Sequence, residues 1–120
     1  MSGERAVSDR TDETACCCPA SHPLSEAELA ADVGVLTTLG SETRYEALRF
    51  IAAADDGVCV CELEPELGVS QGAVSQALSR LFGSGLVDRR KEGRWRYYTA
   101  TERAEKLLAV LDETRTLDGD

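Results

Sequence analysis

Apolar residues recur at helical spacing in the first half of the chain. Leu29, Val33 and Leu36 lie three or four residues apart and follow a serine-led capping box, which predicts a helix over residues 24–38. Another serine cap and apolar stripe predict a second helix over residues 41–54. This part of the chain is therefore expected to be helical.

Two shorter apolar stripes follow. Leu63 and Leu67 form one stripe, and residues 74–81 contain the other. Gly68 between them can adopt the positive φ that a tight helix connection needs, and Ser70 can cap the following helix with its hydroxyl oxygen. The stretch predicts a helix-turn-helix.

The remaining pattern predicts a hairpin and a last helix. Glycines within residues 82–85 are expected to stop the preceding helix. Residues 86–91 and 94–98 are typical of two strands around a two-residue turn, and residues 101–115 predict a threonine-capped helix. The expected fold class is mainly α with a small β-hairpin.

Alternation along the second strand separates its side chains into two sets. Arg94, Arg96 and Tyr98 are expected on one face, and Trp95 and Tyr97 on the other. We expect the arginine face to contact the phosphates of bound DNA and the opposite face to pack against the rest of the protein.

The polar face of the helix that follows Ser70 has the chemistry of a major-groove reader. It carries glutamine, which can pair with adenine, and arginine, which can pair with guanine. It also carries serine, which can pair with either of these bases. The candidate DNA-binding residues, hairpin included, are Ser70, Gln71, Ser75, Gln76, Ser79, Arg80, Arg89, Arg90, Lys91, Arg94 and Arg96.

The charge of the chain is uneven. The net charge is −9, yet residues 70–98 hold six basic residues and only two acidic ones. Two lysines beside eleven arginines, in an acid-rich chain, indicate a halophile's cytoplasm. At molar salt the Debye length is about 3 Å, so the overall negative charge would hardly repel DNA.

The five cysteines favour ion binding over disulfides. The chain shows no export signal or membrane-length apolar run, so we expect a cytoplasmic location, in which thiols stay reduced. Cys59 and Cys61 share a face only if their segment is extended or lies at a distorted helix start. A second group comprises Cys16, Cys17 and Cys18.

Several of these motifs, in this order, resemble the ArsR/SmtB family of winged-helix metalloregulatory repressors. The matching pieces are Leu-Gly-Ser-Glu-Thr-Arg at 39–44, Val-Cys-Val-Cys-Glu-Leu at 58–63, Val-Ser-Gln-Gly-Ala-Val-Ser-Gln-Ala-Leu at 69–78 and Ser-Gly-Leu-Val at 84–87. The resemblance implies a winged helix-turn-helix homodimer, joined through its first and last helices. It also implies a repressor that holds double-stranded operator DNA as the apo dimer and leaves it when an effector binds.

The cysteine set resembles that of arsenic sensors in the family, with one departure. Such sensors often carry a third cysteine where this chain has Glu64. Relatives also use cysteines near the N-terminus, which implies a site for arsenite or antimonite shared between subunits. Its ligands would be Cys59 with one or two of Cys16, Cys17 and Cys18, and Cys61 is a further candidate.

Other effectors and roles stay open. The same thiolates could bind cadmium, lead or zinc, or they could sense oxidants or reactive sulfur. The family's zinc site on the last helix is disfavoured, because residues 101–115 contain no histidine. His22, the only histidine, is expected to be solvated rather than a ligand.

A thiol-disulfide enzyme or a metal-trafficking protein would not explain the helix-turn-helix. No catalytic constellation or phosphate-binding glycine loop is present, so we expect neither enzymatic activity nor an organic cofactor. The expected organisation is a flexible cysteine-bearing arm (1–20), a winged helix-turn-helix domain (21–115) and an acidic tail (116–120).

Overall fold

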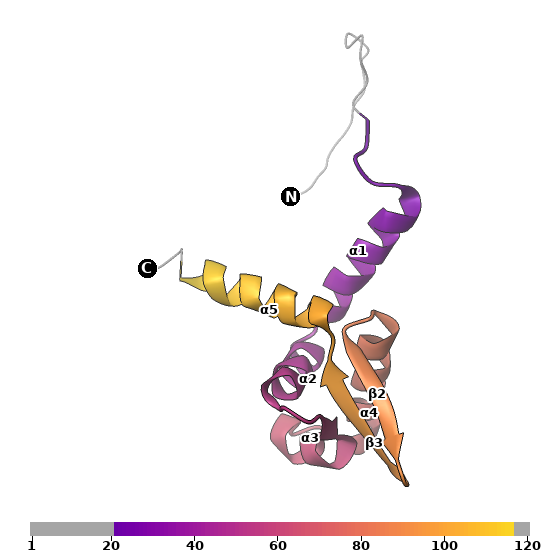
Figure 1. Ribbon diagram of the computed structural model, residues 1–120, viewed down its shortest axis with the longest axis vertical. Helices are drawn as coiled ribbons and strands as arrows, with labels where there is room; N and C mark the ends of the chain where they lie inside the picture. The colour runs from indigo at the N-terminus through magenta and orange to yellow at the C-terminus, as the bar shows by residue number, and fades with distance from the viewer. Residues whose placement is uncertain (1–20, 117–120) are drawn as a thin grey trace.

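A computed structural model describes residues 21–116. These residues form five helices and a three-stranded sheet (Figure 1). In chain order the elements are α1 (Glu26–Leu39), α2 (Glu42–Ala53), β1 (Val58–Cys59), α3 (Val60–Leu67), α4 (Gln71–Gly83), β2 (Val87–Glu92), β3 (Trp95–Ala100) and α5 (Glu102–Arg115). The predicted arm and most of the predicted acidic tail lie outside the described residues.

Hydroxyl side chains begin four of the helices, as the sequence predicts. Ser25, Ser41, Ser70 and Thr101 each accept a hydrogen bond from a backbone N–H in the first turn of the helix that follows. Each oxygen replaces the carbonyl partner that a first-turn amide lacks. The predicted turn after α3 is also confirmed, because Gly68 has a φ of +68°.

The core lies where α2, α3 and α4 pack together and against the sheet. Leu48 and Ile51 of α2 meet Leu78 and Leu81 of α4, and all four are fully buried. Leu86 lies in the same core, directly before the first wing strand. The helix-turn-helix is therefore fixed on α2.

The sheet contains a strand that the sequence pattern left out. Its order is β1-β3-β2, with Val58 opposite Tyr98 and Cys59 opposite Tyr97. The wing, β2 and β3, is thus hydrogen-bonded to the short strand that leads into α3.

Three local predictions for the wing region are wrong. The two-residue turn is Gly93-Arg94, because Glu92 pairs with Trp95, so Arg94 belongs to the turn. Helix α4 continues through Gly83, because glycine at a helix end can keep helical angles.

The third error concerns the faces of β3. Tyr98 is buried in the core, whereas Trp95, expected to pack, is 51% exposed. Strand β3 packs against α2 and β2 against α4, and Val87 and Tyr98 are the residues of these strands that are buried. Burial therefore depends on position along the strand as well as on its face.

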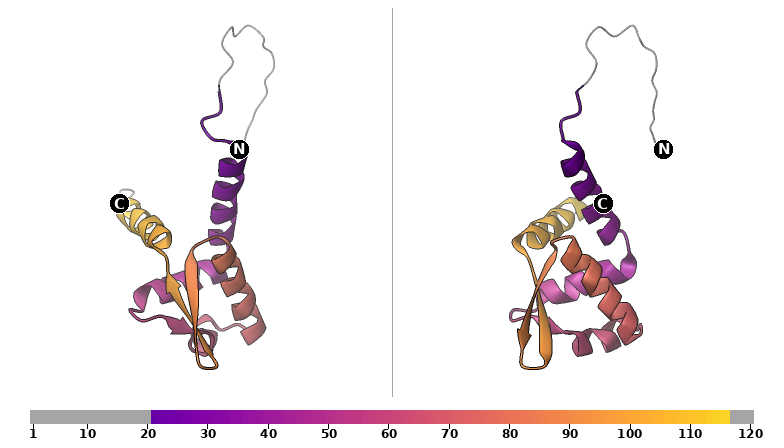
Figure 2. Two further views of the ribbon diagram at one scale, coloured as in Figure 1. Left: turned by 45° about the vertical axis from the view of Figure 1, so that its right-hand side comes forward. Right: turned by 90° about the vertical axis from the view of Figure 1, so that its right-hand side faces the viewer.

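Helices α1 and α5 project away from the core (Figures 1 and 2). Apolar side chains on both are exposed, namely Leu29, Val33, Leu36, Val110 and Leu111. No helix within residues 21–116 has the length and apolar character required to cross a bilayer.

Gly57 permits β1 to approach β3, which leads to a stability prediction. Its φ is +101°, and an added Cβ would lie 3.1 Å from Thr99 Cγ2 and 3.2 Å from the Tyr98 carbonyl oxygen. We expect Gly57→Ala to lower the free energy of unfolding by about 1–3 kcal/mol, measured by denaturant titration at molar salt.

Gly83→Ala is the matched control. Gly83 lies in α4, and an added Cβ there would meet nothing within 4 Å. Alanine at this helical position is expected to stabilise by up to about 1 kcal/mol. Equal effects of the two substitutions would show that Gly57 has no special conformational role.

Candidate DNA-binding surface and thiol site

Helix α4 presents its polar face to solvent. Val74, Ala77, Leu78 and Leu81 turn toward the core. The predicted DNA-facing residues of the helix are all exposed, and they are Gln71, Ser75, Gln76, Ser79 and Arg80. The structure therefore leaves a row of hydrogen-bonding side chains available on one helix face.

The wing arginines differ in the contacts that their guanidinium groups make within the protein. The Arg89 guanidinium lies over the Phe82 ring, 4.0 Å from its centroid, which joins β2 to the end of α4. Arg90 donates to Glu92 at 2.7 Å and to the Asp56 carbonyl oxygen at 3.0 Å. Of the predicted DNA contacts, Arg90 is thus the one most engaged within the wing.

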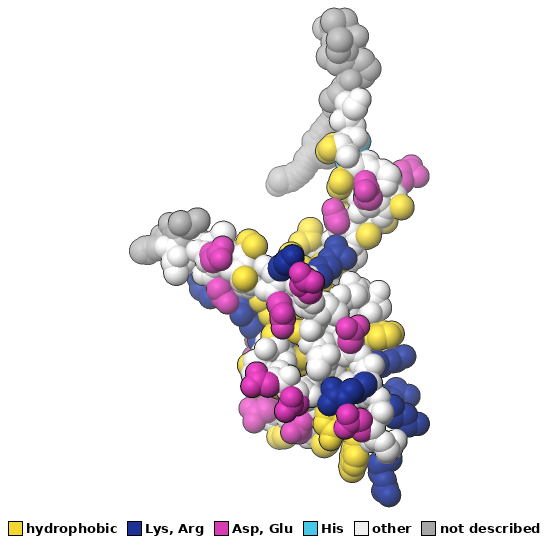
Figure 3. All heavy atoms as spheres, in the orientation of Figure 1, with side chains coloured by type: hydrophobic (Ala, Val, Ile, Leu, Met, Phe, Trp, Pro, Cys, Tyr) yellow, Lys and Arg dark blue, Asp and Glu magenta, His cyan; other side chains and the backbone are white. Residues whose placement is uncertain are grey.

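Cations of the described chain fall into two groups. Those paired with carboxylates are Arg49, Arg90, Arg103, Lys106 and Arg115. Within residues 21–116, no ion pair engages Arg44, Arg80, Arg89, Lys91, Arg94 or Arg96. This second group lies mainly on α4 and the wing, and basic side chains gather along that edge in Figure 3.

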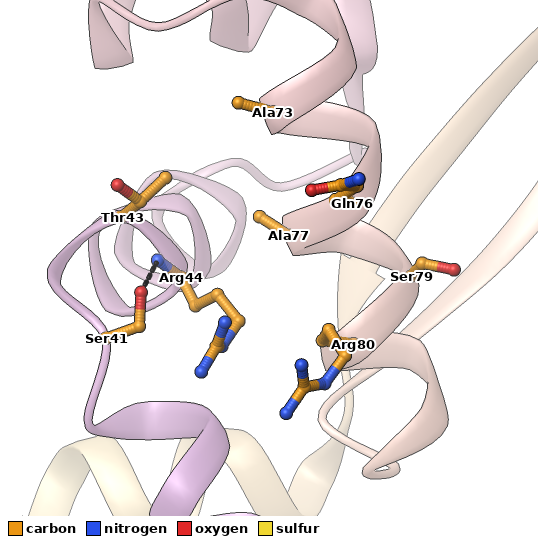
Figure 4. Close-up of a pocket in the computed structure, with 8 residues that line it drawn as sticks. All are labelled: Ser41, Thr43, Arg44, Ala73, Gln76, Ala77, Ser79 and Arg80. Carbon is orange, nitrogen blue, oxygen red and sulfur yellow. Dashed lines mark hydrogen bonds between the residues drawn. The ribbon is translucent and has the colours of Figure 1, made fainter.

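A hollow of about 480 Å³ separates the start of α2 from α4 (Figure 4). Its lining contains two arginines, Arg44 and Arg80, and no carboxylate. Thr43 and Arg44 were not among the DNA contacts predicted from the sequence. A signal existed, because both lie in the Leu-Gly-Ser-Glu-Thr-Arg motif, but the pattern alone does not place α2 beside α4.

The two described thiols lie at the junction of β1 and α3. Cys59 is the extended residue before α3 and is buried, whereas Cys61 is exposed in the first helical turn. Their Sγ atoms are 3.1 Å apart. The spacing allows these thiols to converge only where the segment is extended or lies at a distorted helix start, and here the chain is extended at Cys59 and helical from Val60.

Glu62 fixes the backbone at this junction. Its Oε1 accepts a hydrogen bond from the Cys59 N–H at 2.8 Å, which caps α3. The Cys61 thiol donates to Cys59 Sγ, and this bond, with desolvation and the nearby Cys59 and Glu62 charges, raises the pKa of Cys61. Cys61 therefore favours its neutral thiol form.

The third ligand of the predicted site is not within the described residues. No group of three ion-binding side chains occurs within residues 21–116, and Glu64 is exposed. Cys16, Cys17 and Cys18 fall outside that range. In all views the first turn of α1 lies at the opposite end of the molecule from α3 (Figures 1 and 2).

A helix-turn-helix followed by a wing, with a polar exposed recognition face, defines a winged-helix DNA-binding protein. The model of the "Bacterial regulatory protein, arsR family" matches residues 41–89, which include the helix-turn-helix. The chain belongs to this family of transcriptional regulators, since a relative is similar along nearly its whole length.

That relative is named "Putative arsenical resistance operon repressor ArsR2", from Halobacterium salinarum. It is 60% identical over 91% of this chain and 89% of its own. A second Halobacterium salinarum protein, with the corresponding name ArsR, is 49% identical over 72% of this chain and 67% of its own. These relatives agree with the halophilic origin that the composition indicates.

Solved structures confirm the fold. HlyU from Vibrio cholerae matches with a TM-score of 0.65 and 31% identity, over 75% of this chain and 97% of its own. NolR from Sinorhizobium fredii matches with a TM-score of 0.67 and 28% identity, over 78% and 96%.

The exposed Trp95 provides a direct test of the wing. It is the only tryptophan of the chain and adjoins the wing turn. We expect saturation with operator duplex to change its emission and to reduce quenching by acrylamide, because DNA would cover the wing. Saturation would be verified separately by anisotropy of labelled duplex, and unchanged emission and quenching at that point would remove the wing from the interface.

Proposed function

We propose that the protein is a homodimeric repressor that binds operator DNA in its apo form and is released when arsenite or antimonite binds its thiols. The observation that carries this proposal is the Cys59–Cys61 pair, with sulfurs 3.1 Å apart where β1 meets α3. The names of the Halobacterium salinarum relatives support an arsenical effector.

The thiol pair has suitable chemistry for one soft ion. Trivalent arsenic takes three sulfurs, and a tetrahedral zinc or cadmium ion takes up to four. Two sulfurs at 2.3 Å from a tetrahedral zinc ion are about 3.8 Å apart. A small opening of the Cys59–Cys61 pair would therefore fit it to such an ion.

Dimerisation would occur through α1 and α5, as the family resemblance implies. Exposed apolar side chains on both helices support this arrangement, and Leu36 is 68% exposed. Burying such side chains favours association by roughly 25 cal/mol per Å². The dimer would place two α4 helices in successive major grooves, about 34 Å apart.

The arm would complete the site from the partner subunit. Helix α1 begins at the opposite end of its own chain from α3 (Figure 1), which favours a ligand contribution from the partner subunit. One or two of Cys16, Cys17 and Cys18 would join Cys59 and Cys61 across the dimer. Such a site senses by binding, without catalysis, and requires the reduced thiols of a cytoplasm.

Release follows from linkage between the two sites. An effector that prefers the DNA-free conformation lowers operator affinity by the same factor by which DNA lowers effector affinity. Two connections support this coupling: Cys59 pairs with Tyr97 of the wing, and Cys61 belongs to the helix before α4. Drawing the thiols around one ion would act on both DNA-binding elements.

The first test is release of the protein from its own upstream DNA. At molar salt with reductant, we expect arsenite to release the wild type, and Cys59→Ser or deletion of residues 1–18 to raise the required concentration at least about tenfold. The reason is the loss of one thiolate from a three-sulfur site. Binding would be followed by anisotropy of labelled duplex.

Gly83→Ala serves as the control for this titration, because it leaves every thiol in place. If the deletion leaves arsenite affinity unchanged, the proposed site shared with the arm is wrong. Release by an effector bound to Cys59 and Cys61 alone would remain consistent with that result. If the wild type binds DNA and arsenite has no effect, the proposed effector is wrong.

The pH dependence of binding distinguishes a metalloid from a metal cation. Arsenous acid condenses with three neutral thiols, forming three As–S bonds and releasing three waters, without net proton release. Cadmium instead displaces thiol protons, including that of Cys61, whose pKa is raised. Between pH 6 and 8, arsenite affinity should stay nearly constant, whereas cadmium affinity should rise about tenfold per pH unit for each proton displaced.

Isothermal titration in two buffers of different ionisation enthalpy would count the protons directly. An arsenite affinity that rises as steeply as that of cadmium would contradict condensation with neutral thiols. A response only to oxidants, reversed by reductant, would support the redox-sensing alternative.

DNA recognition should divide between the wing and α4. Removing an exposed wing cation with Arg96→Gln should weaken binding to all duplexes alike and reduce the salt slope by about 1. Gln76→Ala should instead change base preference, at a cost of about 1–3 kcal/mol for the cognate site. Competition between operator and unrelated duplex measures the loss of affinity and the change in base preference. If each variant lost the same affinity for operator as for unrelated duplex, this division would be refuted.

A further inference from the structure

The hollow between α2 and α4 has an unusual composition for so acidic a chain. The net charge is −9, yet the lining combines the Arg44 and Arg80 guanidinium groups with the polar side chains of Ser41, Thr43, Gln76 and Ser79. On the α4 side the lining includes Ala73 and Ala77, whose short side chains fill little of the space. The lining therefore offers an anion hydrogen-bond donors and contains no carboxylate that would repel it.

Arg44 is held in place before any ligand arrives. Its Nε donates to the Thr38 carbonyl oxygen at 2.8 Å, and its Nη2 donates to the Thr37 carbonyl oxygen at 3.3 Å. These are end carbonyls of α1, where a cation also interacts favourably with the helix dipole. Two of the five guanidinium N–H groups are used in this way, which leaves about three for a ligand.

Arg80 supplies the second wall. It is exposed on α4, and in Figure 4 its guanidinium extends toward the same space as that of Arg44. No ion pair within residues 21–116 neutralises either group. Two guanidinium groups that face one space repel each other, and a bound anion would relieve that repulsion.

Phosphate is the anion whose geometry fits this arrangement. Guanidinium groups bind phosphate oxygens through paired N–H donors, and a preorganised arginine loses little conformational entropy on binding. The hollow flanks the recognition face of α4, where the backbone of a duplex with α4 in its major groove would pass.

We propose that this hollow is a DNA phosphate subsite, in which Arg44, fixed by the end of α1, and Arg80 close on one phosphate beside the recognition helix. The subsite rests on the proposed DNA binding and adds α2 to the interface. It fixes the register of α4 in the groove, and it assigns Arg80 to a phosphate rather than to the guanine contact that its residue type suggested.

The test uses operator duplexes that each carry one uncharged methylphosphonate linkage, at positions placed by footprinting. For the wild type, one linkage per half-site should lower affinity about tenfold or more. Arg44→Gln and Arg80→Gln should each lower the affinity for unmodified DNA by about the same factor. Neither variant should lose further affinity when that one linkage is a methylphosphonate, whereas both should still respond to the other linkages. The double variant should lose little more than either single variant, because both residues hold one phosphate.

Two further comparisons make the test specific. Lys106→Gln removes an equal charge from an exposed position on α5, and it should keep the wild-type methylphosphonate profile. Arg44→Lys should lose nearly as much as Arg44→Gln, because lysine cannot reproduce the fork that binds Thr37 and Thr38, whereas Arg80→Lys should retain part of the affinity.

The outcomes separate this proposal from the proposed function. If the wild type binds the duplex and both glutamine variants keep its methylphosphonate profile, the subsite is wrong and DNA binding stands. If the wild type binds no duplex, the proposed function itself fails. Arg80→Gln leaves the bonds of Arg44 to α1 intact, so it remains informative if Arg44→Gln unfolds.

Inorganic phosphate tests the other source of the same chemistry. At constant ionic strength, millimolar phosphate should not compete with operator DNA more effectively for the wild type than for Arg44→Gln. Selective competition with the wild type would assign the hollow to a free phosphate ion and overturn its assignment to DNA.

Discussion

The pairing of β1 with β3 is the contact on which the functional architecture depends. Two residues, Val58 and Cys59, form this strand, and they join the helix-turn-helix to the wing. The close approach requires the positive φ of Gly57. Because β1 ends where α3 begins, the chain changes from extended to helical between the two thiols. That change alone brings Cys59 and Cys61 onto one side, since residues two apart diverge on a continuous helix.

Electrostatics explains how so acidic a chain can present a DNA-binding face. Carboxylates pair with three cations on α5, with Arg49 of α2 and with Arg90 of β2, whereas Arg44, Arg80 and Arg96 have no such partners within residues 21–116. At high salt, distant charges are screened within a few ångströms. Affinity then depends on direct contacts, which favours a fixed guanidinium such as Arg44 over a diffuse positive surface.

The sequence predicted features set by local chemistry and missed those set by packing. Serine and threonine caps and the Gly68 turn depend on neighbouring residues, so they were predicted correctly. For Cys59 and Cys61, the spacing indicated only which backbone shapes would bring the thiols together, and the structure has one of them. The burial of Tyr98 depends on how far the core extends beneath the wing. Arg44 and Arg80, 36 positions apart in the sequence, become neighbours only through the packing of α2 on α4.

Helix α1 has a structural role beyond the proposed dimer interface. Its last turn binds α2 through Arg44 and reaches α4 through the Thr38 hydroxyl, which lies 2.7 Å from that of Ser84. Thr38 is only 2% exposed, so this contact is shielded from water. In the proposed dimer, a rotation of α1 would therefore move both walls of the hollow. An effector bound by the arm that precedes α1, and by thiols beside the wing, would act on the recognition helix from both of its ends.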